Sequence, residues 1–156
     1  MDALSRSFYV VRHAKAGSRS HWTGDDGLRP LSKKGRKQAE ELVEILEAYP
    51  IRAIISSPYV RCVETVEPVA RARQMDVNSS AALVEGHGLD GLNQFLLDPA
   101  LDQIVLCTHG DIVWELVEYL VNRKLIRPGD GGFAKGSTWV LEVDEEVVKA
   151  QFLPAP

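Results

Sequence analysis

Cysteine is scarce in this 156-residue sequence, which contains only Cys62 and Cys107. Two cysteines are too few for a disulfide scaffold, so the composition favours a reducing, cytoplasmic setting. No apolar run approaches the roughly 18 residues that a membrane-spanning helix needs. The N-terminal segment MDALSRS lacks the apolar core of a signal peptide. We therefore expect no membrane partner.

Positive charge is not in excess either. Lysine and arginine number 18 against 22 aspartates and glutamates, which gives a formal net charge of −4. That balance argues against a surface that binds nucleic acid. The sequence shows no internal repeat, low-complexity tract or interdomain linker. Its length fits one compact domain, residues 1–156, with a substantial core.

The sequence does contain a regular succession of buried strands and amphipathic helices. Apolar, β-branched runs predict strands over residues 7–12, 52–56, 103–108, 138–143 and 147–153. Apolar residues at helical spacing predict helices in the regions 32–49, 58–70, 92–97 and 110–120. Pro68 should kink or divide the second of these helices. Glycine and proline predict long loops over residues 14–30 and 128–136.

This alternation of strands and helices predicts the α/β class, as a three-layer α/β/α sandwich with a mainly parallel sheet. Parallel strands end at the same edge of a sheet. The pairs Arg12-His13, Ser56-Ser57 and Thr108-His109, which stand at strand exits, should therefore meet along one edge. The sequence leaves open whether the C-terminal strand pair lies antiparallel within this sheet or at its edge.

Five chemically active side chains converge in this arrangement: Arg12, His13, Arg61, Glu85 and His109. Two guanidinium groups and two imidazoles near helix N-termini form an anion site, and phosphate suits the bidentate hydrogen bonds of arginine. A neutral histidine there can attack phosphorus as a nucleophile. A nearby carboxylic acid can protonate the leaving oxygen.

Four short motifs, taken in order, resemble those of a known family. They are RHAKAG, SSPYVRCVET, LVEG and THG. On these motifs the chain resembles the histidine phosphatase superfamily, also called phosphoglycerate mutase-like, over residues 8–143. Ala14 stands where the first family motif has glycine, and Glu64 stands where the second has glutamine. The resemblance implies the phosphoglycerate mutase-like fold.

The resemblance also implies a role for each of the five side chains. His13 would be the nucleophile that becomes phosphohistidine, and Glu85 would be the general acid. Arg12, Arg61 and His109 would hold the phosphoryl oxygens, with His13 beside them. No metal or other cofactor is implied, because the positive pocket stabilises the transferred group. The expected function is metal-independent hydrolysis of a phosphohistidine or phosphomonoester.

The short length and the RHA start are most similar to the SixA-type phosphohistidine phosphatases. The chain is also similar to the histidine phosphatase domain that is fused to Nudix hydrolases in actinobacteria, although it contains no Nudix box. The mutase branch is longer and carries inserts that this chain lacks. The expected partner is therefore a phosphorylated protein or a small phosphorylated molecule, such as a nucleotide. A phosphate-recognition module without turnover is the alternative from another class, and the oligomeric state is not indicated.

Basic residues are concentrated between residues 15 and 37. Either this segment is a solvated helix start, or it forms a rim that attracts a polyanionic substrate, with Lys15 and Arg19 as the nearest contributors. Trp22 could stack on a base or pack the loop.

We interpret the remaining titratable side chains near the motifs as having no part in the chemistry. We expect His21 and His87 to be exposed and the two cysteines to be buried small hydrophobes. The four histidines lack the spacing of metal ligands.

Overall fold

The structure is a computed structural model that describes residues 5–156. The first four residues of the segment MDALSRS lie outside the described residues. Within residues 5–156, no helix is both long and apolar enough to cross a membrane.

Six strands form one sheet in the order β3-β2-β4-β1-β5-β6. The first four strands in the sequence are parallel to one another: β1 (Arg6–Arg12), β2 (Ala53–Ser56), β3 (Val77–Ser79) and β4 (Ile104–Thr108). The strand β5 (Thr138–Asp144) pairs antiparallel with β1, and β6 (Glu146–Leu153) pairs antiparallel with β5 at the sheet edge. The C-terminal pair therefore extends the main sheet, which settles the point that the sequence left open.

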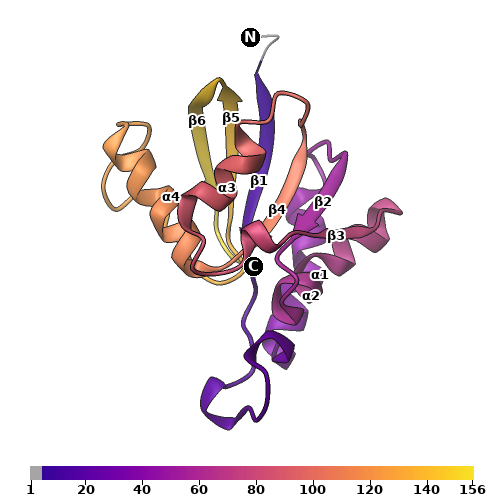
Figure 1. Ribbon diagram of the computed structural model, residues 1–156. Coiled ribbons are helices and arrows are strands. Elements are labelled where there is room, and N and C mark those ends of the chain that lie inside the picture. Colours follow the sequence, from indigo (N-terminus) through magenta and orange to yellow (C-terminus); the bar gives the residue numbers. More distant parts are fainter. Residues whose placement is uncertain (1–4) are drawn as a thin grey trace.

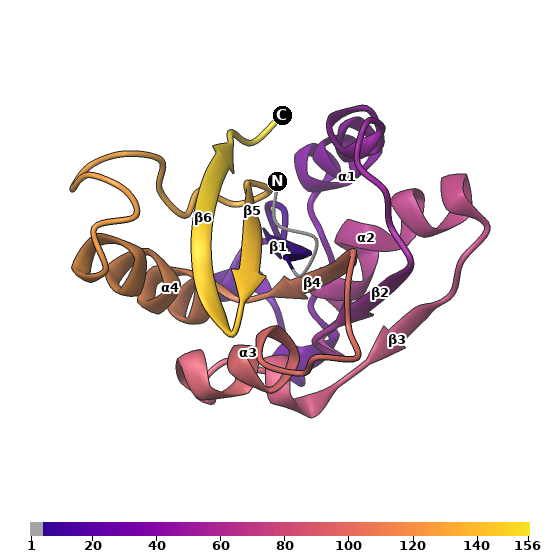
Figure 2. The ribbon, with the colours of Figure 1, turned by 90° about the horizontal axis from the view of Figure 1, so that it is seen from above.

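Helices cover both faces of this sheet, so the predicted three-layer sandwich is confirmed (Figure 2). On one face lie α1 (Lys33–Leu46) and α2 (Val60–Arg73), and on the other lie α3 (Gly88–Leu96) and α4 (Gly110–Asn122). Alternation along β1 explains the two cores. Phe8 and Val10 pack with the α3 and α4 side, whereas Tyr9 and Val11 pack with the α1 and α2 side.

The long loop after β1 has more order than its composition predicts. It contains two short 3-10 turns, η1 (Arg19–His21) and η2 (Asp26–Leu28). An isolated bridge between Ala16 and Leu31 closes it. In Figure 1 this loop extends beyond the carboxyl end of β1. The segment after β3 likewise contains a 3-10 turn, η3 (Ala81–Leu83).

The start of α1 is fixed against this loop. Ser32 Oγ accepts a hydrogen bond from the Gly35 N–H at 3.1 Å, as an N-cap does. Gly35 lies so close to the carbonyl of Lys15 that any Cβ there would clash with it. Glycine at this position therefore lets the helix seat directly beside the segment that follows His13.

Pro68 does not divide the second helix, which was one of the two effects predicted for it. Helix α2 runs without interruption from Val60 to Arg73. Proline in a helix removes one hydrogen bond and costs about 3 kcal/mol. Burial of Cys62, Val66 and Val69 against the sheet offsets that cost.

Candidate active site

The carboxyl ends of β1, β2 and β4 bring the sequence motifs together. The His13 N–H donates to the Thr108 carbonyl, and the Ser57 N–H donates to the Cys107 carbonyl, both at 3.0 Å. These bonds continue the sheet by one residue beyond each strand. They hold the rings of His13 and His109 at a centroid distance of 5.6 Å.

His13 is held in one tautomer by its own backbone. Its Nδ1 lies 2.8 Å from the carbonyl oxygen of Ala14. Because a carbonyl can only accept, Nδ1 carries the proton and Nε2 keeps its lone pair. Burial lowers the pKa of His13 to about 3, and the bond to Ala14 opposes this only in part. The positive charges of Arg61 and Arg12 lower the pKa further. The side chain is therefore a neutral imidazole at neutral pH.

Ala14, which replaces the family's glycine, does not obstruct the site. Its side chain is fully buried in a small cluster with Leu31 and Ala39. Its N–H donates to Thr65 Oγ1 at 2.9 Å, which ties the residue after His13 to α2. The methyl group therefore packs behind His13 and outside the cavity lining.

His109 is held by a hydrogen bond at Nε2, whereas His13 is held at Nδ1. Its Nε2 lies 2.8 Å from Ser57 Oγ and 3.6 Å from Cys62 Sγ. The ring of Tyr59 contacts the imidazole edge-on at 4.8 Å between centroids. These contacts leave Nδ1 on the pocket side, 3.8 Å from Glu85 Oε2.

Arg61 extends from the first turn of α2 into the site and is 1% exposed. Its Nη1 donates to the Asp26 carbonyl at 3.0 Å, and its Nη2 lies 3.1 Å from Asp26 Oδ2. The same Nη2 is 3.6 Å from Glu85 Oε1. The guanidinium also stacks on the Tyr59 ring at 4.9 Å. Asp26 is a site residue that the sequence analysis missed.

Arg12 approaches from the end of β1. Its Nη1 donates to the Phe133 carbonyl at 2.7 Å. A Cβ on Gly110 would lie 2.5 Å from the guanidinium, so the glycine of the THG motif makes room for this arginine. The Nε atoms of Arg12 and Arg61 are both buried without a hydrogen-bond partner. Two unsatisfied cationic donors in one site favour an anionic ligand.

Glu85 is positioned by the loop between η3 and α3. Thr108 Oγ1 donates to the Leu83 carbonyl at 2.7 Å, and the Gly86 N–H donates to Asp111 Oδ2 at 2.8 Å. The Glu85 side chain is 39% exposed, so it faces the pocket with one oxygen toward Arg61 and the other toward His109. A carboxylate placed there can exchange protons with solvent and with a bound phosphate.

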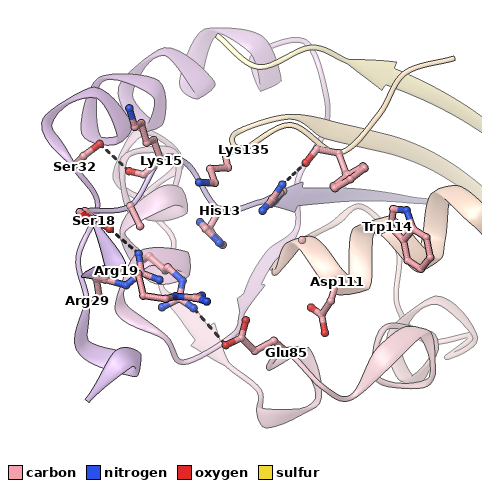
Figure 3. A pocket seen from close by; sticks show the side chains of 16 residues that line it. His13, Lys15, Ser18, Arg19, Arg29, Ser32, Glu85, Asp111, Trp114 and Lys135 are labelled. Atoms are coloured by element: carbon pink, nitrogen blue, oxygen red, sulfur yellow. Dashed lines mark hydrogen bonds and ion pairs between the residues drawn. The ribbon is translucent and has the colours of Figure 1, made fainter. Parts of the chain in front are cut away.

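A cavity of about 970 Å³ is lined by Arg12, His13, Arg61 and Glu85, whereas His109 lies behind its lining (Figure 3). Both predicted rim residues, Lys15 and Arg19, belong to its lining. Other lining residues were not predicted from the sequence, among them Asp111, Trp114, Phe133 and Lys135. Trp22 does not line the cavity, and its indole N–H donates instead to the Asp25 carbonyl at 2.9 Å.

The other two histidines and the two cysteines lie as predicted. His21 and His87 are exposed, and both cysteines are buried free thiols. Cys62 nevertheless touches His109, a contact that a separation of 47 residues hides in the sequence. Among the described residues, no group of three or more histidine, cysteine, aspartate or glutamate side chains could hold a metal ion.

Comparison with known proteins identifies the family to which this fold and this site belong. The family model of the histidine phosphatase superfamily (branch 1) matches residues 8–91, which include His13, Arg61 and Glu85. The chain therefore belongs to the histidine phosphatase superfamily.

Some known proteins are similar to this chain in sequence and others in fold. The chain is 38% identical over 158 residues to an 8-oxo-(d)GTP phosphatase of Mycolicibacterium smegmatis. That alignment covers 97% of this chain and 49% of the relative, so the chain spans about half the length of this curated relative. A SixA protein of Agrobacterium tumefaciens has the same fold, with a TM-score of 0.77 at 22% identity over 96% of this chain and 97% of that one.

A second solved structure, the protein histidine phosphatase SixA complexed with tungstate, also has this fold. Its TM-score is 0.73 at 18% identity, over 95% of this chain and 94% of that chain. The predicted phosphoglycerate mutase-like, SixA-type architecture is thus confirmed at the level of the fold.

Proposed function

We propose that this chain is a metal-independent phosphatase that works through a covalent phosphohistidine on His13. The observation that carries the proposal is the state of the His13 ring. Its Nδ1 is committed to the Ala14 carbonyl, its Nε2 is free, and burial keeps it unprotonated. A neutral imidazole surrounded by cationic donors can attack the phosphorus of a bound phosphate.

In the first step, His13 Nε2 forms a bond to phosphorus while the bond to the leaving group breaks. Arg12, Arg61 and His109 stabilise the charge on the transferred phosphoryl oxygens. When the leaving group needs a proton, the protonated Glu85 side chain supplies it. The products of this step are the free leaving group and the phosphorylated enzyme.

In the second step, water attacks the phosphohistidine. Glu85, now ionised, takes a proton from this water, the N–P bond breaks, and orthophosphate leaves. Both steps use the same cationic donors, so no metal ion is needed to stabilise the charge.

The substrate is proposed to be a small phosphorylated molecule. A cavity of about 970 Å³ lies within the range of small-molecule sites. Similarity to a relative named 8-oxo-(d)GTP phosphatase favours a nucleotide. The second candidate is a phosphohistidine on a protein, favoured by the match to the fold of the protein histidine phosphatase SixA.

The test is hydrolysis of p-nitrophenyl phosphate in the presence of a chelator, compared between wild type and His13→Ala. We expect turnover in wild type, acid-labile labelling of the enzyme by substrate phosphate, and neither in the variant. His21→Ala is the matched control, because that histidine is exposed and does not line the cavity. Activity that requires added metal, or that survives in His13→Ala, would contradict the proposal. Binding of vanadate without any turnover would instead favour a phosphate-recognition module.

A further inference from the structure

Cations outnumber acids in the cavity lining. Six cationic side chains line it: Arg12, Lys15, Arg19, Arg29, Arg61 and Lys135. Only two carboxylates do so, Glu85 and Asp111. The proposed phosphoryl transfer uses Arg12 and Arg61. The proposed transfer does not use the other four cationic side chains of the lining, Lys15, Arg19, Arg29 and Lys135.

One carboxylate outside the lining balances part of this excess. Asp26 Oδ1 lies 3.0 Å from Arg29 Nε and 4.0 Å from Arg19 Nε, and its Oδ2 contacts Arg61. A single negative charge is thus shared by three guanidinium groups. In the part of the chain that the structure describes, no carboxylate pairs with Lys15 or Lys135.

The two unpaired lysines come from segments that are held together. Gln38 of α1 connects them, because its Oε1 accepts from the Lys15 N–H at 3.0 Å and its Nε2 donates to the Lys135 carbonyl at 3.3 Å. The next residue, Gly136, donates its N–H to the carbonyls of Arg12 and His13 at 3.0 and 3.1 Å. The backbone that carries Lys135 is therefore fixed to the strand end that carries the nucleophile.

The lysines also lie on one side of the reacting centre. Figure 3 shows Lys15 and Lys135 on the side of the pocket where Arg19 and Arg29 lie, and Trp114 on the opposite side. Burial lowers the pKa of Lys135, and the positive charges of Arg12, Lys15, Arg29 and Arg19 lower it further. Crowded cations without acids raise the free energy of the empty pocket, and a bound anion removes that cost.

We propose that Lys15 and Lys135, supported by Arg19, form a second anion subsite that binds the phosphate adjacent to the transferred phosphoryl group. The substrate class is then a phosphoanhydride, such as a nucleoside diphosphate or triphosphate, and the inference rests on the proposed function. The P–O bond between the terminal phosphorus and the bridging oxygen breaks, and the bond to His13 Nε2 forms. Hydrolysis of the phosphoenzyme then releases orthophosphate, while the shortened phosphate chain is the leaving group.

A phosphate leaving group also suits the position of Glu85. Such a group departs as an anion more readily than an alkoxide does, so it depends less on a proton donor. Glu85 Oε1 lies 3.6 Å from Arg61 Nη2, on the side of the reacting phosphoryl group. Cations on the leaving-group side can stabilise the departing phosphate in place of that proton.

The test compares kcat/KM for GDP, inorganic pyrophosphate, GMP and p-nitrophenyl phosphate in wild type, Lys15→Ala and Lys135→Ala. We expect wild type to prefer the two diphosphates. In each variant, the ratio of kcat/KM for a diphosphate to that for p-nitrophenyl phosphate should fall roughly tenfold, as expected for loss of a charge-assisted contact. Lys37→Ala, which removes an exposed lysine outside the cavity, should leave the ratio unchanged. A preference for GDP that is absent with pyrophosphate would assign selection to the nucleoside and overturn the subsite.

Calorimetry with pyrophosphate and orthophosphate tests the subsite without catalysis. Wild type should bind pyrophosphate at least about tenfold more tightly than orthophosphate, and each lysine variant should lose that preference. Equal losses for all four substrates would mean general electrostatic attraction and would overturn the subsite. His13-dependent turnover with no preference for diphosphates would overturn the subsite and leave the proposed function intact. If turnover is absent, the proposed function fails, and the binding preference alone decides on the subsite.

Discussion

The two histidines of the site occupy matching positions and have different surroundings. His13 follows β1 and His109 follows β4, and both rings are buried at the same edge of the sheet. The Nδ1 of His13 is tied to its neighbour's carbonyl, and its Nε2 is free. The Nε2 of His109 is instead tied to Ser57, and its Nδ1 faces the pocket beside Glu85.

The hydrogen-bond partner of each imidazole ring determines which ring nitrogen carries the proton. A backbone carbonyl is fixed as an acceptor, so it forces a lone pair onto the other nitrogen of His13. A serine hydroxyl can donate to Nε2 of His109, which leaves its Nδ1 able to carry a proton toward an anion. The first arrangement suits a nucleophile and the second suits a donor to phosphoryl oxygens.

The largest expected effect comes from removing one ring at a time. His13→Asn keeps an N–H near Nδ1 but removes Nε2, so we expect turnover to fall by at least about 10⁴-fold with no phosphoenzyme. His109→Gln keeps a polar group near Ser57 but removes the Nδ1 donor. Its rate should fall by roughly 10² to 10³-fold while an acid-labile phosphoenzyme still forms. Rapid-quench labelling with radioactive substrate measures both, and a phosphoenzyme in His13→Asn would reverse the assignment.

Glu85→Gln removes the carboxylate that lies 3.8 Å from His109 Nδ1. For an alkyl phosphate, loss of the general acid should reduce kcat by about 10²-fold or more. For p-nitrophenyl phosphate, whose leaving group needs little protonation, the reduction should stay below roughly tenfold. A series of phosphates with leaving groups of graded pKa measures the difference. Glu118→Gln, an exposed carboxylate on α4, is the control, and a uniform loss across the series would exclude an acid role.

Ser57→Ala tests whether the hydroxyl sets the orientation of His109. Loss of this buried hydrogen bond should reduce kcat by about tenfold. It should also shift the ¹⁵N resonance of His109 Nε2 more than that of Nδ1, because the lost hydrogen bond is made at Nε2. Ser56→Ala is a matched control, because Ser56 Oγ donates to the Ser57 carbonyl at 2.9 Å and does not contact His109. Unchanged His109 shifts in Ser57→Ala would remove serine as the positioning group.

The sequence was sufficient to predict the parts of the site that follow from strand ends. His13, Ser57 and His109 each come directly after a buried run, and parallel strands place such residues at one edge. The sandwich followed from the same alternation of strands and helices. These features depend on local patterns, so they can be read without knowing how distant segments pack.

The parts that were missed depend on the paths of loops. Asp26 contacts Arg61 from 35 residues away, and Lys135 joins the pocket because Gly136 bonds to the end of β1. The hydrophobic periodicity of the sequence does not predict the path of either loop. One signal was present for Asp26, since it is one of very few acids within a strongly basic segment. Pro68 does not divide α2, because tertiary burial outweighs a local preference.

The smallest expected effect is on stability, and it again separates the two rings. The pKa of His13 is about 3 in the folded chain and about 6.5 when unfolded. As pH falls from 7.5 to 5, the unfolded chain gains a proton at this position and the folded chain does not. The free energy of unfolding should therefore decrease on account of His13, by about 2 kcal/mol at pH 5.

Urea unfolding of wild type and His13→Asn at pH 7.5 and pH 5 measures this contribution, because other titrating groups largely cancel in the comparison. Wild type should lose about 2 kcal/mol more than the variant over this interval. The His109→Gln variant serves as the second arm, and it should retain the His13-dependent loss. If wild type and His13→Asn lose equal stability, His13 is protonated in the folded chain at pH 5, and a neutral imidazole at this position is excluded at that pH.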